Sequence, residues 1–172
     1  MDTLITTSGL RETMQTRRAG WEALLARVGE ERMLLPGVEG NWSIKDIIAR
    51  VTWYEHSLTT WLKAVARDEV LARGEIDGLS LDERNAWIFE HNHGRPLEDV
   101  RAEARQVFTE LVQAVSRFAG RDLTDPTRIE RFIAPYWSNK PPLSECIAGD
   151  SYEHYQEHIL PVTAWLATLD SK

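Results

Sequence analysis

The sequence predicts an all-α protein, a four-helix bundle with a short extra helix in its crossover connection. Three observations favour this class. Long segments carry apolar residues at helical spacing, prolines and glycines separate these segments, and alternating strand patterns are nearly absent. The 172 residues suit a single domain, residues 1–172, because a chain of this length buries roughly two-thirds of its surface on folding.

The first two helices are predicted from periodicity and from a start signal. Residues 8–28 place apolar side chains on one helical face, and Gly29 ends the segment. Ser43 and Asp46 form a capping box at the start of the second helix. In this motif the serine hydroxyl accepts from the Asp46 N–H while the carboxylate reaches back. The second helix carries the clearest amphipathic pattern in the chain.

Three further helices follow. A second capping box, Ser80 with Glu83, begins a short helix within the crossover of residues 67–96. Residues 104–118 then carry another apolar stripe at helical spacing. After an irregular stretch, residues 143–169 are predicted to form one continuous last helix.

The composition excludes several classes of function. The formal net charge is -7, and phosphate binding needs clustered basic residues, so no nucleic-acid partner is expected. The single Cys146 excludes an internal disulfide framework and a multi-cysteine metal site. No apolar run approaches the roughly 20 residues that span a bilayer, and residues 1–9 lack the parts of a signal peptide. We therefore expect a cytoplasmic protein with no membrane partner.

Two histidines of the last predicted helix are candidates for a functional site. His154 and His158 lie four residues apart, so both imidazoles project from one face, beside core positions. Two neutral imidazoles at this spacing can bind one divalent ion. The same spacing also suits two histidines that only make hydrogen bonds at the edge of a bundle. The spacing does not distinguish these two interpretations.

The second helix supplies a matching anomaly. Glu55 falls within its apolar arc, and a buried carboxylate is costly unless it is paired or bound to a metal. His154 and His158 are the obvious partners for Glu55, although a slightly rotated helix would let its side chain reach solvent. Arg50 lies at the edge of the same arc. It either enters the cavity or rests its aliphatic stem on apolar neighbours.

These residues also carry a resemblance to a known family. The block WSIKDIIA at residues 42–49, continuing to TWYE at 52–55, resembles the second-helix signature of the DinB/YfiT-like superfamily. The block DSYEHYQEH at residues 150–158 resembles its last-helix signature, and both blocks are most similar to the ClbS/DfsB-type branch. The resemblance extends over residues 8–169. It implies a DinB-like four-helix bundle with a site between helices.

Members of the superfamily typically bind a divalent metal such as nickel or zinc through three histidines. Two of these match His154 and His158, whereas the second-helix position falls on Arg50. Arginine stays protonated and cannot ligate a metal. Two outcomes remain open. Glu55 replaces the missing ligand in a two-histidine, one-carboxylate set, or the metal is lost and Arg50 binds an anionic group.

The resemblance implies two kinds of activity. ClbS-like relatives protect cells from a reactive genotoxin by hydrolytic opening of its electrophilic group, and metal-bearing relatives transfer low-molecular-weight thiols. The leading expectation is a self-protection or detoxification hydrolase that acts on a reactive electrophile in a pocket between the second and the last bundle helix. The alternatives are a metal-dependent thiol transferase and a non-catalytic protein that binds or sequesters a small molecule.

The leading expectation gives each candidate residue a role. His158 or His154 is the general base, Glu55 orients an imidazole, and Arg50 holds an anion or oxyanion. Three aromatic residues complete the expected ligand-binding set: Tyr54, Trp137 and Tyr155.

Seven tryptophans are a high proportion for this length. Trp137 lies in the loop before the histidine helix, where it is expected to roof the cavity. Trp53 points away from the core arc of the second helix. Because an exposed indole often marks an interface, Trp53 is expected to pack beneath the crossover or against a second subunit of a homodimer.

Overall fold

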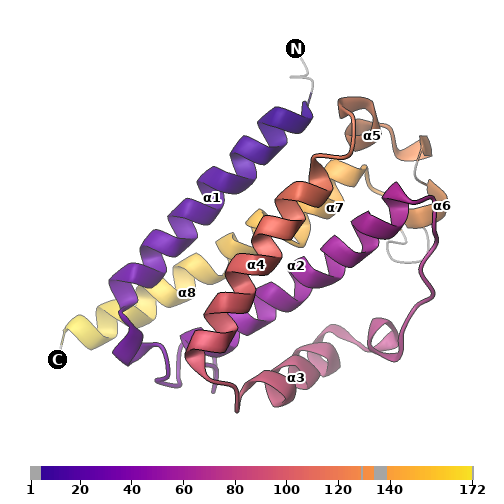
Figure 1. The fold of residues 1–172 in the computed structure, drawn as a ribbon. Coiled ribbons are helices and arrows are strands. Elements are labelled where there is room, and N and C mark those ends of the chain that lie inside the picture. The colour runs from indigo at the N-terminus through magenta and orange to yellow at the C-terminus, as the bar shows by residue number, and fades with distance from the viewer. Residues whose placement is uncertain (1–4, 129, 134–138, 172) are drawn as a thin grey trace.

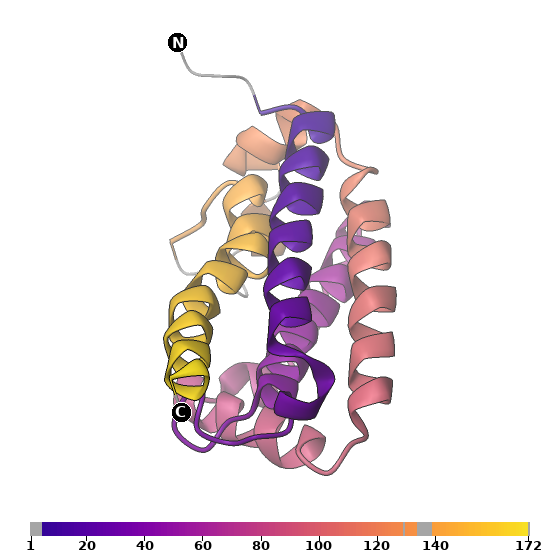
Figure 2. The same cartoon turned by 90° about the vertical axis from the view of Figure 1, so that its left-hand side faces the viewer.

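The computed structural model describes residues 5–128, 130–133 and 139–171, and its regular elements in these ranges are all helical. The all-α class predicted from the sequence is therefore confirmed. Four long helices pack as a bundle: α1 (Thr7–Val28), α2 (Ile44–Ala66), α4 (Leu97–Val115) and α8 (Tyr152–Asp170). Helix α1 packs against α8, and α2 packs along α4 (Figure 1). The described ends of the chain lie at opposite ends of the bundle (Figure 2).

The connection between α2 and α4 crosses the length of the bundle and carries the extra helix. It contains the short 3-10 turn η2 (Glu75–Gly78) and helix α3 (Leu81–Asn92), which packs against α2. Because this connection returns to the end where α2 begins, α2 and α4 run in the same direction (Figure 1). Both predicted capping boxes form, one at Ser43 and the other at Ser80.

The last predicted helix is divided, which corrects the expectation of one helix over residues 143–169. Helix α7 (Leu143–Gly149) ends before α8 begins, and Ser151 between them has the non-helical angles φ -134° and ψ -101°. Glycine, aspartate and serine in succession are poor helix formers, and the Ser151 hydroxyl donates to the Ile147 carbonyl oxygen instead of continuing the helix. The break places Asp150 in a pocket beside α2.

Short helices fill the remaining connections. The 3-10 turn η1 (Glu30–Arg32) follows α1. The stretch between α4 and α7, expected to be irregular, contains α5 (Gly120–Thr124), η3 (Pro126–Arg128) and α6 (Glu130–Ile133). These elements gather with α7 at the end of the bundle where α1 begins (Figure 1).

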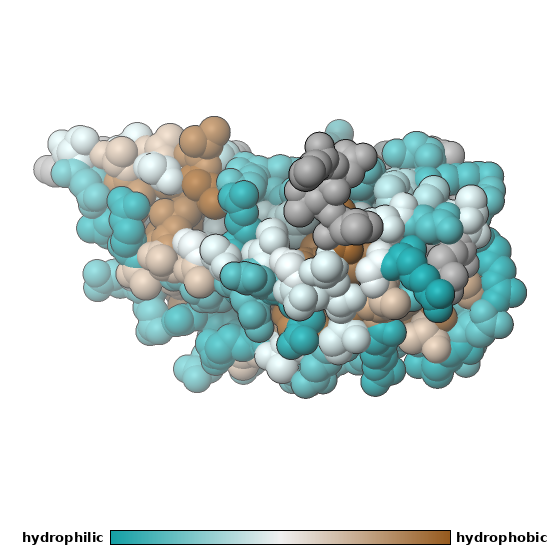
Figure 3. All heavy atoms as spheres, turned by 90° about the horizontal axis from the view of Figure 1, so that it is seen from above, coloured by the Kyte–Doolittle hydropathy of each residue, from teal (hydrophilic) through white to brown (hydrophobic). Residues whose placement is uncertain are grey.

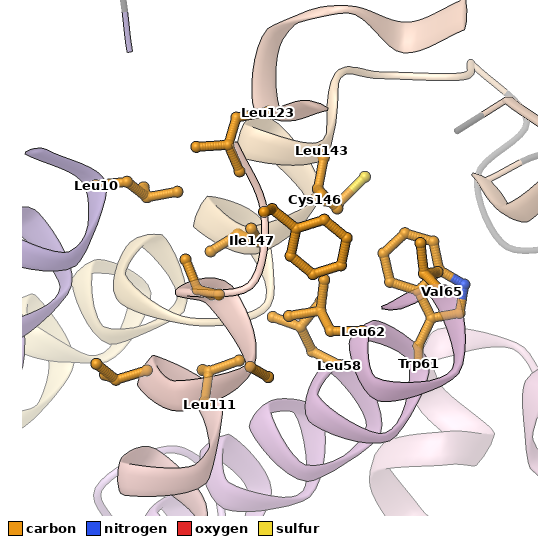
Figure 4. Close-up of a cluster of buried hydrophobic side chains, with 14 of the residues drawn as sticks. Leu10, Leu58, Trp61, Leu62, Val65, Leu111, Leu123, Leu143, Cys146 and Ile147 are labelled. Carbon is orange, nitrogen blue, oxygen red and sulfur yellow. The ribbon is translucent and has the colours of Figure 1, made fainter. Parts of the chain in front are cut away.

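The buried apolar residues form two clusters along the bundle. The first joins the start of α1, the end of α2 and α4, and α7, as Figure 4 shows: Leu10, Leu58, Leu62, Leu111, Leu123, Leu143 and Ile147. The second joins the end of α1, the start of α2 and α4, and α8: Trp21, Leu25, Ile44, Ile47, Val100, Val162 and Leu166. A buried polar layer contains Arg18 from the middle of α1, Glu55 from the middle of α2 and Tyr155 from the first turn of α8.

The surface combines hydrophilic and apolar regions (Figure 3). Figure 3 shows one face that is mainly hydrophilic, with an apolar patch towards one end. Within the described part of the chain, no helix combines the length and the apolar character needed to cross a membrane.

Candidate functional site

Glu55, which the sequence assigned to the histidine site, belongs to the polar layer. Glu55 is fully buried, and its carboxylate accepts hydrogen bonds from Arg18 Nη1 (3.3 Å) and from the Tyr155 hydroxyl. Arg18 Nη2 also donates to the Ala104 carbonyl oxygen (3.2 Å), and Arg18 Nε donates to Glu22 (2.8 Å). Both oxygens of Glu55 therefore have partners on α1 and α8. No hydrogen bond joins Glu55 to either histidine in the described structure, so its predicted roles as an imidazole-orienting group or a third metal ligand gain no support there.

Tyr155, which was predicted to bind the ligand, belongs to the same layer. Its ring stacks on Trp21 with a centroid separation of 6.0 Å and an interplanar angle of 6°. No part of the side chain reaches solvent, and its hydroxyl donates to Glu55 while accepting from Arg18. Tyr155 thus joins α8 to α1 and α2 within the core.

The pKa values of the three side chains in the polar layer are all shifted. Burial raises the pKa of Glu55 to about 7, although Arg18 and the Tyr155 hydroxyl act in the opposite direction. Burial also raises the pKa of Tyr155, and the neighbouring carboxylate adds to this effect. Burial acts to lower the pKa of Arg18, but Glu55, Tyr155 and Glu22 together more than offset it, so this pKa is raised. Arg18 and Tyr155 therefore keep their protons at neutral pH, and Glu55 is the group that titrates.

The raised pKa of Glu55 predicts a specific pH dependence of stability. The ordinary value is 4.5 and the folded value is about 7, so the folded state binds more protons than the unfolded state between these limits. The stabilisation that proton binding to Glu55 gives the folded state is complete below pH 4.5 and is lost as the pH rises through 7. Relative to Glu55→Gln, the wild type should lose about 3 kcal/mol of unfolding free energy between pH 4.5 and pH 8.

Urea unfolding of both proteins at several pH values measures this difference. Glu22→Gln is the matched control, because Glu22 also contacts Arg18 but its side chain is 44% exposed. A wild type that gains stability relative to Glu55→Gln with rising pH would mean that the ion pair with Arg18 outweighs burial and would contradict this prediction.

The histidine pair lies apart from Glu55 and has a different carboxylate partner. His158 Nδ1 lies 2.6 Å from Glu39 Oε1, in the loop before α2. An ionised carboxylate only accepts hydrogen bonds, so in the neutral imidazole Nδ1 carries the proton and Nε2 carries the lone pair. His158 Nε2 is buried and has no hydrogen-bond partner among the described residues. Glu39 and His158 therefore form a carboxylate–imidazole dyad with a free basic nitrogen.

His154 lies beside this dyad. Its ring centroid is 5.0 Å from that of His158 and 5.0 Å from that of Tyr54, whose ring meets it edge to face. Burial lowers the pKa of His154, and with the smaller effects of His158 and Arg50 the value falls to about 3. His154 is therefore neutral at physiological pH and a weak base, which leaves His158 as the stronger candidate for proton transfer.

Arg50 approaches the same cluster from α2. Its guanidinium carbon lies 5.7 Å from the ring centroid of Trp42, within the range of a cation–π contact. Its Nε is buried and unpartnered within the described ranges. Arg50, Trp42 and Glu39 line an open groove of about 360 Å³ that also includes Asn85 of α3. The groove thus joins a cation with an unused donor to the carboxylate that holds His158.

The donors of this cluster do not fit the divalent metal that the resemblance implies. Nowhere in residues 5–128, 130–133 and 139–171 do three or more histidine, cysteine, aspartate or glutamate side chains come together to hold a metal ion. Glu55 is engaged elsewhere, and Arg50 occupies the second-helix position of the set. The charge of Arg50 that disfavours protonated His154 also disfavours a metal cation there. We derive no chemical step through a metal.

This disagreement predicts the metal content of the protein. Protein purified without a polyhistidine tag should contain nickel and zinc well below one ion per chain, because two imidazoles facing a guanidinium bind a cation weakly. Elemental analysis by mass spectrometry measures the content directly. Stoichiometric nickel or zinc that disappears in both His154→Ala and His158→Ala would contradict this prediction and favour the thiol transferase.

Trp137 lies outside the described residues. The other sequence candidates have clear positions. Tyr54 lines a pocket next to the histidine cluster, and Trp53 lines the same pocket beneath the crossover, as expected for that indole. Cys146 is buried, and burial raises the pKa of its thiol to about 12, so it is a core residue and not a nucleophile.

Two important residues were missed by sequence reasoning. Arg18 lies four residues after Met14 and three before Trp21, which are both core positions, so its spacing on α1 was a usable signal. Glu39 lies in a loop with no periodicity. Its partnership with His158 joins residues 119 positions apart, and the sequence contains no signal for it.

Comparison with known proteins supports the fold. No family model matches this chain, and no curated protein matches it. The structure is similar to a crystal structure of a protein from Streptococcus pneumoniae, with a TM-score of 0.79 and 9% sequence identity. The similarity covers 96% of this chain and 92% of that chain. At this identity the likeness shows a shared fold and carries no information on function.

Proposed function

We propose that the protein is a small-molecule hydrolase of the self-protection or detoxification type that acts on a reactive electrophile. The observation that carries the proposal is the free, buried Nε2 of His158, whose ring is oriented by the bond between Nδ1 and Glu39. A carboxylate that fixes the tautomer of a histidine leaves the other nitrogen available as a general base.

In the proposed reaction Arg50 and Glu39 act from the groove, and His158 acts from behind Glu39, to which it is hydrogen-bonded. His158 Nε2 removes a proton from water as the water oxygen attacks the electrophilic carbon. Arg50 stabilises the negative charge that develops on the substrate oxygen, using the Nε–H that has no hydrogen-bond partner among the described residues. The protonated imidazole, stabilised by Glu39, then returns the proton to the leaving group. For an ester, water and substrate become an acid and an alcohol.

The aromatic walls of the groove suit a planar or apolar substrate body. Trp42 packs against Phe89 of α3 with a centroid separation of 5.3 Å, and both residues line the groove. Both rings are partly exposed, so they offer apolar surface to a bound molecule. An electrophile with an aromatic or conjugated body and an oxygen near its reactive carbon fits these groups.

The first test compares hydrolysis of two reactive probes, 4-nitrophenyl acetate and styrene oxide, with and without the protein. We expect acceleration of at least one of them above the buffer rate. Long-range ¹H–¹⁵N NMR spectra should also show the Nδ1–H tautomer for His158. Failure with both probes, together with an Nε2–H tautomer, would reject the proposal and favour a protein that only binds or sequesters its ligand.

A further inference from the structure

A second pocket lies beneath the crossover, on α2. It encloses about 130 Å³ and is lined on one side by Trp53, Tyr54 and Trp61 of α2. Arg84 of α3 and Asp150, at the break between α7 and α8, complete its wall. The histidines do not line this pocket, and Tyr54, which meets the ring of His154, lies between the two sites.

Arg84 Nε and the Asp150 carboxylate have no hydrogen-bond partner among the described residues, although the charges of the two side chains attract each other. The Nε of Arg84 is buried and makes no hydrogen bond with the described residues, although its Nη2 donates to the carbonyl oxygens of Asp77 (3.3 Å) and Leu79 (3.4 Å). The carboxylate of Asp150 likewise has no hydrogen bond to any described residue. Burial raises its pKa to about 6, although the charge of Arg84 acts in the opposite direction. Such groups are costly to bury unless they are satisfied, so the pocket presents an unused donor beside an unused acceptor.

The charges of the pocket favour a neutral occupant. Arg73 and Arg84 are offset by Asp77 and Asp150, which line the same space. A cation would face two guanidinium groups, and an anion would face two carboxylates. A neutral molecule that accepts from Arg84 and donates to Asp150 satisfies both orphaned groups without adding a charge.

The size and the walls of the pocket favour a single aromatic ring. A cavity of roughly 150 Å³ holds benzene, so a pocket of about 130 Å³ suits a molecule of similar size. Trp53 and Trp61 offer flat indole faces, and the Trp61 Nε1–H already donates to the Phe132 carbonyl oxygen. Trp61 is therefore held in place and presents apolar surface.

We propose that this pocket binds a small, neutral, planar molecule whose edge carries an N–H donor beside a hydrogen-bond acceptor, such as an aromatic primary amide or a lactam. The N–H donates to the Asp150 carboxylate, the acceptor receives the Arg84 Nε–H, and the ring packs against Trp53 and Trp61. The proposal is independent of the hydrolysis at His158, since the pocket shares no residue with the Glu39–His158 dyad.

Three probes of similar size test the proposal in the full chain: nicotinamide with donor and acceptor, nicotinate with acceptors only on its substituent, and aniline with a donor only. Titration calorimetry should give a nicotinamide Kd of about millimolar or tighter. The other two should bind at least about tenfold more weakly. Equal binding of the three probes, or no binding of nicotinamide, would overturn the proposal.

Variants locate the binding. Asp150→Ala and Arg84→Met should each weaken nicotinamide binding by about tenfold or more, whereas the exposed controls Asp99→Asn and Arg105→Met should leave it unchanged. His158→Ala should also leave it unchanged, which separates this site from the proposed hydrolase. If Asp150→Ala or Arg84→Met fails to fold, the wild type still decides the question. Its Trp53 indole resonance must shift on titration with nicotinamide, and an unshifted Trp53 would overturn the proposal.

Discussion

Replacing His158 with alanine is expected to reduce hydrolysis of a reactive probe by about 10²-fold or more, the usual contribution of a general base. The free Nε2 is the group that accepts the proton from water, and neighbouring His154, whose pKa is lowered to about 3, is too weak a base to replace it. Glu39→Gln should reduce the rate less, because the amide retains a weaker partner for Nδ1. Initial rates over a range of pH measure both effects.

Two controls test whether His158 has a purely structural role. His56→Ala removes an exposed histidine of α2 and should leave the rate unchanged. The thermal midpoint of His158→Ala should stay near that of the wild type, since Glu39 is partly exposed and can bond to water once its partner is gone. If His158→Ala instead destabilises the fold severely while the hydrolysis rate per folded molecule is unchanged, the dyad is a structural element and the proposed function fails.

Replacing Glu55 with leucine is expected to lower the free energy of unfolding by about 3–5 kcal/mol, the usual cost of removing one partner of a buried charged pair. The change leaves Arg18 charged and the Tyr155 hydroxyl without its acceptor, both deep between the two apolar clusters. Arginine cannot escape this cost by losing its proton. Urea unfolding followed by circular dichroism measures the loss.

Matched variants separate the requirement for an acceptor from the requirement for a charge. Glu55→Gln keeps an oxygen that accepts from Arg18 and Tyr155, so at pH 5 it should lie within about 1 kcal/mol of the wild type. Arg18→Met should cost less than Glu55→Leu, because the remaining carboxyl group can hold its proton. The double variant should lose less than the sum of the two single losses. A strictly additive double variant would show that Arg18 and Glu55 are not coupled.

Helix positions were largely predictable because each depends on local signals. The capping boxes at Ser43 and Ser80 form as expected, since their partners are only three residues away. The division of the last helix was not predicted. Residues 143–169 keep an apolar pattern across the break, and the weak propensity of Gly149, Asp150 and Ser151 is decisive only where the surroundings do not support the helix.

The residues of the candidate site were predicted better than the contacts that these residues make. His154, His158 and Arg50 do lie in one cluster, because their faces on α2 and α8 follow from helical periodicity. Glu55 was correctly placed in the core, but its partners are Arg18 and Tyr155. Periodicity gives the direction of a side chain and does not say which of several facing helices supplies its partner.

The sequence by itself therefore determined that the chain is helical, where most helices begin, and that Glu55, His154 and His158 lie on inward faces. These properties depend on hydrogen bonds and apolar spacing within a few residues. Only the tertiary structure decided that Arg18 neutralises the core carboxylate, that Glu39 orients His158, and that Asp150 and Arg84 share a pocket. Each of these pairings joins segments distant in the chain, so its energy depends on how the helices pack against one another.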